Sequence, residues 1–319
     1  IRLTATDAAG NISHYSTTKE VNFETDAPII TNFDVSPNPA TIGPVAITFA
    51  VSETLEFDPV VTVNGQLSII HGPSSMVNGL WSYAYVYNVS SSDQQGSAVV
   101  SIEVTDLAGN TSLFTSHDSL TIDLSAPTAP TMGNLPAYTN IATRNVAGTA
   151  EPGSRISTYN NDVLAAVATA DASGLFNSRI ILQLGSNQIM IEAEDFAGNV
   201  SQLSTPQTVI YDTTAPTLDS FSINPVLAKA QPVSIRFVVS EPLLVDPAIT
   251  VNGHSVNKVI GTKIGASDAW RYEYVYQVPT NETQGLAQIR VAMTDRAENI
   301  FVHSFNDSLK SAIWSPEMG

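Results

Sequence analysis

Acidic side chains recur at matched places along this sequence of 319 residues. A five-residue motif, Asp-x-Ala-Gly-Asn, begins at Asp7, Asp106, Asp195 and Asp295, with Glu298 in place of the glycine in the last copy. A glutamate also stands 24 or 25 residues after the proline of each of three Ala-Pro pairs. Crowded carboxylates repel one another unless a cation neutralises them, and Ca²⁺ takes roughly six to eight oxygen ligands. If the fold gathers these acids, they suit Ca²⁺.

The spacing of the motif divides the chain into tandem units. Its aspartates lie 99, 89 and 100 residues apart, and an Ala-Pro pair begins 20 residues after each of the first three. Solenoid repeats are about 20–50 residues long, whereas a unit of this length can own a core. Because proline favours extended linkers, the pairs mark boundaries. We predict a C-terminal remnant of a preceding domain over 1–27, domains over 28–126 and 127–215 (a shorter variant), and a domain with an atypical C-terminal tail over 216–319.

Apolar residues alternate with polar ones before each motif copy. Val100, Ile102 and Val104 precede Asp106 at a period of two. This pattern predicts half-buried strands of antiparallel sheets, and no segment carries a sustained helical stripe. Short strands, frequent turn residues and units of this length predict β-sandwiches of about seven strands each.

The unit over 127–215 carries motifs of a known family. They are Val146-Ala-Gly-Thr-Ala-Glu-Pro-Gly153, Ala170-Asp-Ala-Ser-Gly-Leu-Phe176, Gly185-Ser-Asn-Gln-Ile189, Asp195-Phe-Ala-Gly-Asn199 and Asp212-Thr-Thr-Ala-Pro216. The chain resembles, over essentially its whole length, the bacterial Ig-like domains found in tandem in surface proteins and adhesins. The resemblance implies an all-β chain of tandem immunoglobulin-like antiparallel β-sandwiches in an extracellular bacterial protein, at the cell surface or secreted.

The topology of such a sandwich predicts where the acids meet. The loops after its second and sixth strands lie at the end beside the preceding linker. If the motif forms the turn after the sixth strand, it lies there together with the repeated glutamate and with acids ending the previous domain. We predict three inter-domain Ca²⁺ sites, formed by Asp26, Glu53 and Asp106, by Asp123, Glu151 and Asp195, and by Asp212, Glu241 and Asp295.

A local role for the motif stays open beside the metal hypothesis. Each motif aspartate has the same parity as the core-facing residues before it. There it can accept hydrogen bonds from the amides of the following turn, while the Gly-Asn pair supplies positive φ. Because Glu298 is strained at such a position, we expect the last turn to differ from the other three.

Two aromatic runs offer a second candidate site. They are Trp81, Tyr83, Tyr85 and Tyr87, and Trp270, Tyr272, Tyr274 and Tyr276. Such rows of rings can stack on sugars. In the second run, however, the opposite parity holds Arg271, Glu273 and Gln277, so the aromatic face is the one we expect to be buried.

Composition excludes several classes of function. Thirteen basic against 30 acidic residues give a net charge of −17, so nucleic acid is not an expected partner. The apolar runs are too short to insert into a membrane, and the chain has no cysteine. Its five histidines hold no repeated position or metal-binding spacing, and no catalytic motif is present. We do not expect an enzyme.

The sequence favours a mechanical and adhesive role. We expect a non-enzymatic stalk or adhesion segment of a large bacterial surface protein, acting as a semi-rigid spacer or binding rod. Its expected partners are the neighbouring Ig-like domains of the chain, a cell-surface protein or glycan, or further copies through open edge strands. One alternative is a subunit of a self-assembling extracellular fibre, sheath or surface layer. The other is an accessory module of a secreted hydrolase.

Overall fold

The computed structural model describes residues 4–14, 23–77, 80–228, 230–263, 270–282 and 285–311. These residues form strands and no helix, and accordingly no helix among them is long and apolar enough to cross a membrane. Contacts group the chain into two compact units. The first is Ile1–Ala126 with Asp195–Asn199, and the second is Pro127–Glu194 with Val200–Gly319.

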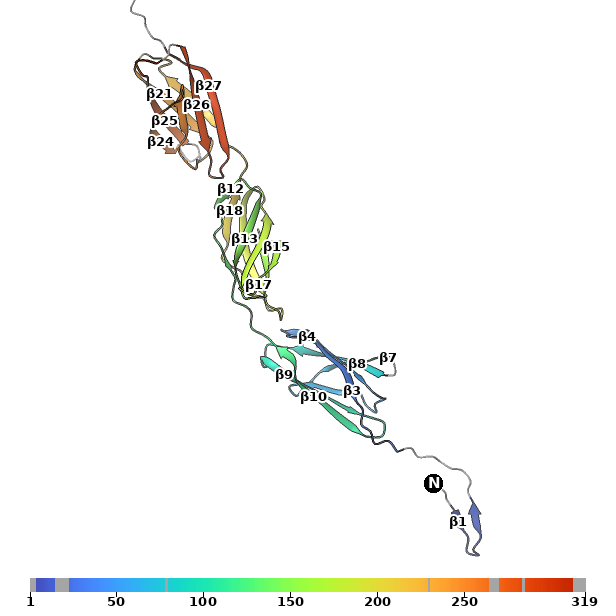
Figure 1. Cartoon of the computed structure of the whole chain (residues 1–319). Coiled ribbons are helices and arrows are strands. Elements are labelled where there is room, and N and C mark those ends of the chain that lie inside the picture. The colour runs from blue at the N-terminus through green and yellow to red at the C-terminus, as the bar shows by residue number, and fades with distance from the viewer. Residues whose placement is uncertain are drawn as a thin grey trace, which may run out of the picture. The chain divides into compact units, whose positions relative to one another are not determined.

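The first unit contains a hairpin and a two-sheet sandwich (Figure 1). The hairpin pairs β1 (Thr4–Thr6) with β2 (Ile12–His14). The sandwich stacks the sheet β3-β4-β8-β7 on the sheet β10-β9-β5-β6. Its strands are β3 (Ile30–Ser36), β4 (Gly43–Val51), β5 (Val60–Val63), β6 (Gln66–Leu67), β7 (Ile69–Val77), β8 (Leu80–Val89), β9 (Gly96–Thr105) and β10 (Thr111–Ile122). We call this the first sandwich.

Alternation along the strands builds the core of the first sandwich. Val100, Ile102 and Val104 of β9 are buried and face Tyr85 and its neighbours on β8 within one cluster. Their sequence neighbours on β9 are exposed or half-buried. The predicted period-two strands are therefore confirmed here.

The second sandwich begins the second unit. A sheet ordered β11-β13-β16 packs against a sheet ordered β12-β18-β17-β14-β15. Its strands are β11 (Thr131–Met132), β12 (Tyr138–Thr139), β13 (Thr143–Thr149), β14 (Arg155–Asn160), β15 (Val163–Thr169), β16 (Leu175–Ile181), β17 (Gly185–Glu194) and β18 (Gln207–Tyr211).

The third sandwich repeats the plan of the first. The sheet β19-β21-β25-β24 corresponds to β3-β4-β8-β7, and β27-β26-β22-β23 corresponds to β10-β9-β5-β6, with β20 added beside β27. Its strands are β19 (Leu218–Asn224), β20 (Leu227–Ala228), β21 (Pro232–Val239), β22 (Ala248–Val251), β23 (His254–Ser255), β24 (Asn257–Lys263), β25 (Trp270–Gln277), β26 (Gly285–Thr294) and β27 (Ile300–Ser311).

The chain is all-β, as predicted, but not purely antiparallel. The short strand β12 pairs parallel to β18, and β20 pairs parallel to β27. In the first sandwich a single parallel bridge joins Ala40 to Ile122 at the corresponding place. These pairs arise because a segment following the first strand crosses to the opposite sheet and lies beside the last strand.

Candidate functional site

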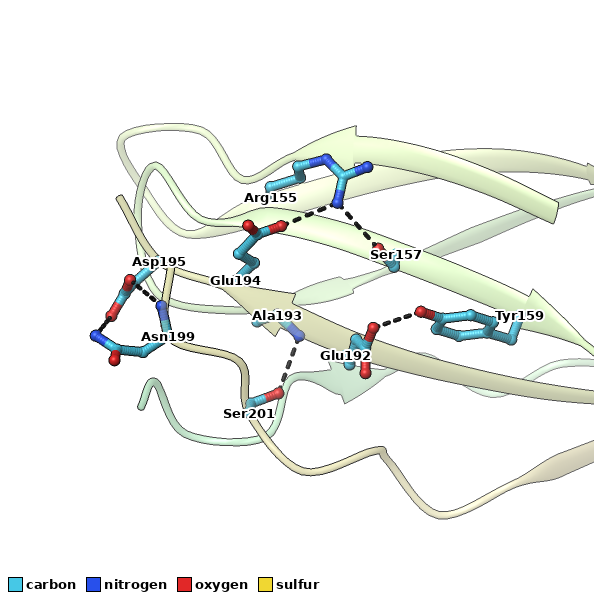
Figure 2. A network of polar contacts seen from close by, with 9 residues as sticks. All are labelled: Arg155, Ser157, Tyr159, Glu192, Ala193, Glu194, Asp195, Asn199 and Ser201. Carbon is cyan, nitrogen blue, oxygen red and sulfur yellow. Dashed lines mark hydrogen bonds and ion pairs between the residues drawn. The ribbon is translucent and has the colours of Figure 1, made fainter. Parts of the chain in front are cut away.

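Each motif aspartate forms a closed turn with the asparagine four residues later. The backbone N–H of Asp106 donates to the carbonyl of Asn110 over 3.0 Å, and Asp106 Oδ1 accepts the backbone N–H groups of Ala108 and Asn110 at 2.8 Å. Asp106 Oδ2 accepts Asn110 Nδ2 at 2.8 Å. The bonds from the asparagine recur in the other three copies at 2.8 or 2.9 Å, and Figure 2 shows them for Asp195 and Asn199. The local role predicted for the motif is confirmed.

These hydrogen bonds keep the buried carboxylate ionised. The side-chain amide of Asn110 and the turn amides together lower the pKa of Asp106, against the desolvation that raises it. Asn11 does the same for the pKa of Asp7. Only 1% of Asp106 is exposed, as its core-facing parity predicted, so the turn supplies the stabilisation that water gives elsewhere.

The prediction that the last turn differs is wrong. Glu298 adopts a φ of 71°, close to the 90° of Gly109, and its N–H donates to the Asp295 carbonyl over 3.2 Å. The Asp295 N–H donates to the Asn299 carbonyl as in the other copies. The hydrogen bonds around Asp295 outweigh the unfavourable left-handed backbone, which costs about 1 kcal/mol for a residue with a Cβ.

Sequence reasoning missed a second role of the turn asparagines. Each of three turn asparagines donates a hydrogen bond from Nδ2 to its own aspartate, and a second one from Nδ2 to a backbone carbonyl of the preceding linker. The acceptors are the carbonyls of Glu24 for Asn110 at 3.3 Å, of Asp123 for Asn199 at 3.0 Å and of Asp212 for Asn299 at 2.9 Å. The signal was present, because asparagine recurs as regularly as aspartate in the motif.

One predicted acidic triad comes together in the second unit. Carboxylate oxygens of Asp212, Glu241 and Asp295 lie within 4.8 Å of one another. Burial, then the charges of Asp295 and Asp212, raise the pKa of Glu241 to about 7. The three belong to the end of β18, the loop after β21 and the turn after β26.

The cavity beside this triad is lined by one basic residue, Arg296, whose hydrogen bond goes to Tyr138 and not to the triad. About 500 Å³ in volume, the cavity is lined by Asp212, Glu241, Tyr138 and Arg296. Arg296 donates to the Tyr138 hydroxyl over 3.1 Å and lies 5.5 Å from its ring centre. None of the ion pairs found in the described ranges involves the triad.

The triad of Asp26, Glu53 and Asp106 is arranged differently. Burial raises the pKa of Glu53, with further contributions from Asp106, Glu24 and Asp26 in that order. A cavity of about 400 Å³ is lined by Glu24, Glu53 and Asp106, and Asp26 is exposed outside it. Among the described residues this triad does not bring three ligand atoms within metal-binding reach.

The middle triad is divided between the two units. Asp123 and Asp195 belong to the first, and Glu151 belongs to the second. Asp195 is bound within its own turn, and Asp123 accepts the N–H of Ser125 at 3.0 Å. Glu151 is exposed, and its carbonyl accepts the Ser154 hydroxyl at 2.6 Å.

The aromatic runs are core, as the parity argument predicted. Tyr83, Tyr85 and Tyr87 are at most 6% exposed, and the equivalent tyrosines of β25 at most 5%. The Tyr85 hydroxyl donates to the Pro59 carbonyl, and the Tyr274 hydroxyl donates to the Pro247 carbonyl at 2.6 Å. These tyrosine rings are therefore not available for sugar stacking, and Trp81 and Trp270 are half-buried against the same cores.

Three comparisons relate the chain to known proteins. The family described as "Bacterial Ig domain" matches residues 126–209. The search of curated proteins found no match to the chain. Among solved structures, a Ca²⁺-stabilised adhesin with which an Antarctic bacterium binds ice is 18% identical, with 98% of this chain and 81% of that chain covered and a TM-score of 0.42.

Two further solved structures are also made of tandem domains. A three-domain I-band fragment of titin is 11% identical, with 91% of this chain and 100% of that chain covered and a TM-score of 0.38. A tetra-tandem repeat from the extending region of a large adhesion protein is 20% identical, with 89% of this chain and 74% of that chain covered and a TM-score of 0.31. The family match bears out the resemblance drawn from the sequence over residues 126–209, and the rest of the chain folds into further β-sandwiches.

Proposed function

We propose that the chain is a non-enzymatic stalk and adhesion segment of a large extracellular bacterial surface protein. In this proposal Ig-like domains over 28–126, 127–215 and 216–319 follow a remnant over 1–27. One observation carries it: a turn asparagine donates to the linker carbonyl ahead of it three times along the chain. A contact repeated at successive linkers suits a part whose task is to hold domains in series.

The repeated polar residues support a structural role over a catalytic one. In all four motif copies the aspartate accepts hydrogen bonds from its own turn. A general acid or base must instead reach a substrate. The acidic surface, with a net charge of −17, keeps such a segment soluble outside the cell.

Removing the turn asparagine tests the linker role. Asn299→Ala deletes bonds to Asp295 and to the carbonyls of Asp212 and Thr214. We expect a loss of about 1–2 kcal/mol of unfolding free energy, because the buried Asp295 and the half-buried Asp212 lose a donor. Spin labels on cysteines introduced at the exposed Ser173 and Ser304 should also give a broader distance distribution.

The matched control is Asn257→Ala, because Asn257 is exposed on β24 and makes no side-chain hydrogen bond with the described residues. It should leave both stability and the distance distribution unchanged. An Asn299→Ala variant whose label distances stayed as narrow as those of the parent would contradict the linker role.

Calcium belongs to the same proposal at the triad of Asp212, Glu241 and Asp295. Three carboxylates whose oxygens lie within 4.8 Å form the hard, anionic donor set that Ca²⁺ prefers. Burial first, and then the charges of Asp295 and Asp212, raise the pKa of Glu241, so its charged form is unfavourable without a cation. Bound Ca²⁺ would offset two of the three negative charges and tie the end of β18 to the loops of the third sandwich.

Glu241→Gln separates the metal site from simple repulsion. In a chelator this variant should melt above the parent, because one of three crowded charges is gone. With Ca²⁺ at 100 times its dissociation constant, the parent should gain about 2.7 kcal/mol and the variant much less. Scanning calorimetry measures both, with the exposed Glu103→Gln as control. If the melting temperature of the parent chain did not change with Ca²⁺, the proposed calcium site would be refuted.

A further inference from the structure

A hollow of about 630 Å³ lies on the outward face of the third sandwich's four-stranded sheet. Ser220 and Ser222 of β19, Arg236 of β21, and Arg271 and Glu273 of β25 line it. They alternate with the buried Phe237 and Tyr272, so they point away from the core. Two of the chain's 13 basic residues thus stand together in a chain of net charge −17.

The two arginines of this hollow are held differently. Arg236 donates to Glu273 Oε1 over 2.8 Å, and the Ser234 hydroxyl reaches the same oxygen at 2.8 Å. These bonds, with that of Arg236 first, lower the pKa of Glu273 and fix the guanidinium at the rim. Arg271 is exposed and makes no hydrogen bond or ion pair with the described residues. The hollow therefore carries one paired and one available guanidinium.

The first sandwich shows that the fold does not require these charges. Arg236 pairs with Glu273 across β21 and β25, and Thr48 pairs with Ala84 at the same register across β4 and β8. The position of Arg271 is held by Ser82. Two sandwiches of the same plan thus differ on this face, and the arginines belong to the surface of the third sandwich alone.

The backbone of this face is already paired. β21 bonds to β19 and β25, and β25 bonds to β21 and β24. A peptide therefore cannot be added as a new strand over the hollow, and recognition must use side chains. Guanidinium groups bind carboxylates, and serine and glutamate oxygens bind hydroxyls. The hollow lies within the range of about 300–1,000 Å³ of small-ligand sites.

From these observations we propose that the third sandwich binds an acidic polysaccharide through this hollow. Arg271 contacts a carboxylate of the sugar, and the serine hydroxyls together with Glu273 contact its hydroxyl groups. The inference rests on the proposed adhesive function and names the class of its ligand. It does not depend on calcium, because none of the triad residues lines the hollow.

Calorimetric titration of the full chain with oligogalacturonate tests the proposal. We expect binding that weakens as salt is added, because the contact is an exposed ion pair. A neutral oligosaccharide of equal length should bind at least about tenfold more weakly, since it lacks the charged partner. Equal binding of the neutral sugar, or binding of poly-glutamate but not of the oligouronate, would overturn the proposal.

Two variants that introduce residues of the first sandwich locate the site. Arg271→Ser should weaken oligogalacturonate binding by about tenfold or more without lowering the melting temperature. The control is Arg290→Ser, because Arg290 is exposed on β26 of the other sheet and the equivalent residue of the first sandwich is Ser101. If Arg271→Ser unfolds, Arg271→Gln serves instead. Equal losses in both Arg→Ser variants would overturn the assignment. If the chain does not bind oligogalacturonate but Ca²⁺ still raises its melting temperature, the proposed ligand is refuted and the proposed stalk function is not.

Discussion

At the scale of single residues, the motif aspartate and asparagine act as one unit. The aspartate collects donors from its own turn, and the asparagine supplies one of those donors and a second one outside the turn. The carboxylate of Asp106 therefore stays charged at a position from which water is nearly excluded. The same pair forms in the last copy even with Glu298 at a backbone angle that favours glycine.

Glu298→Gly should stabilise the third sandwich. Glycine adopts a φ near 71° without the penalty that a Cβ brings, so we expect a gain of about 1 kcal/mol in unfolding free energy. Urea denaturation measures the gain. Glu298→Ala keeps the Cβ and should give no comparable increase. If both variants were equally stabilised, the removed charge rather than the backbone would be the cause.

At the scale of elements, the aromatic strands β8 and β25 organise two cores alike. Phe49 stacks on Tyr83 and Tyr85 at ring distances of 5.6 and 5.9 Å, and Phe237 stacks on Tyr272 and Tyr274 at 5.5 and 5.8 Å. Each strand also turns its opposite face to solvent. That face differs between the two strands, since β25 carries Arg271 where β8 carries Ser82.

The buried tyrosines should resist ionisation in alkali. Burial, with the hydrogen bond to Asp93, raises the pKa of Tyr87 to about 12, and burial raises the pKa of Tyr85 and Tyr274 further. A raised acid pKa in the folded state means that stability is intact below about pH 10 and is lost as the pH rises through the folded-state value. Phenolate absorbance at about pH 11 should therefore report fewer than the ten tyrosines in the native chain, and all ten in urea. Ten tyrosines titrating together near their ordinary pKa in the native chain would contradict this.

At the scale of the whole molecule, the chain is a series of separate cores. Three clusters of buried side chains form, one in each sandwich. Because each cluster is complete within its sandwich, each sandwich can unfold as its own cooperative event.

Pulling the chain from both ends should therefore give three separate unfolding events. Each domain of the proposed division holds about 90–100 residues and should release about 300 Å of chain, at roughly 3.3–3.6 Å per residue. Single-molecule force spectroscopy measures these steps. A single step of about three times that length would mean that the sandwiches unfold as one body.

The sequence predicted what depends on local pattern. The period-two alternation around Val100 placed the buried faces, and parity placed Asp106 inward and the tyrosines in the core. It did not predict the parallel pairing of β20 with β27, since a crossing segment leaves no periodic signal. Of its three acidic triads, one comes together among the described residues, and the triad of Asp123, Glu151 and Asp195, which is divided between the two units, stays a prediction. Whether Glu53, Glu151 and Glu241 approach their partners depends on loop conformations, which residue spacing does not determine.

The side-chain amide of Asn299 donates one hydrogen bond to Asp295 in its own turn and another to the carbonyl of Asp212, just after the last strand of the second sandwich. The turn asparagine of each of the three sandwiches thus donates a hydrogen bond to a backbone carbonyl of the segment that precedes its own sandwich. Deleting one sandwich from the middle of the chain also removes the asparagine that donates to the carbonyl of the linker before it. A shortened chain should therefore end after a complete sandwich whose final linker carbonyl still has its donor, the turn asparagine of the next sandwich.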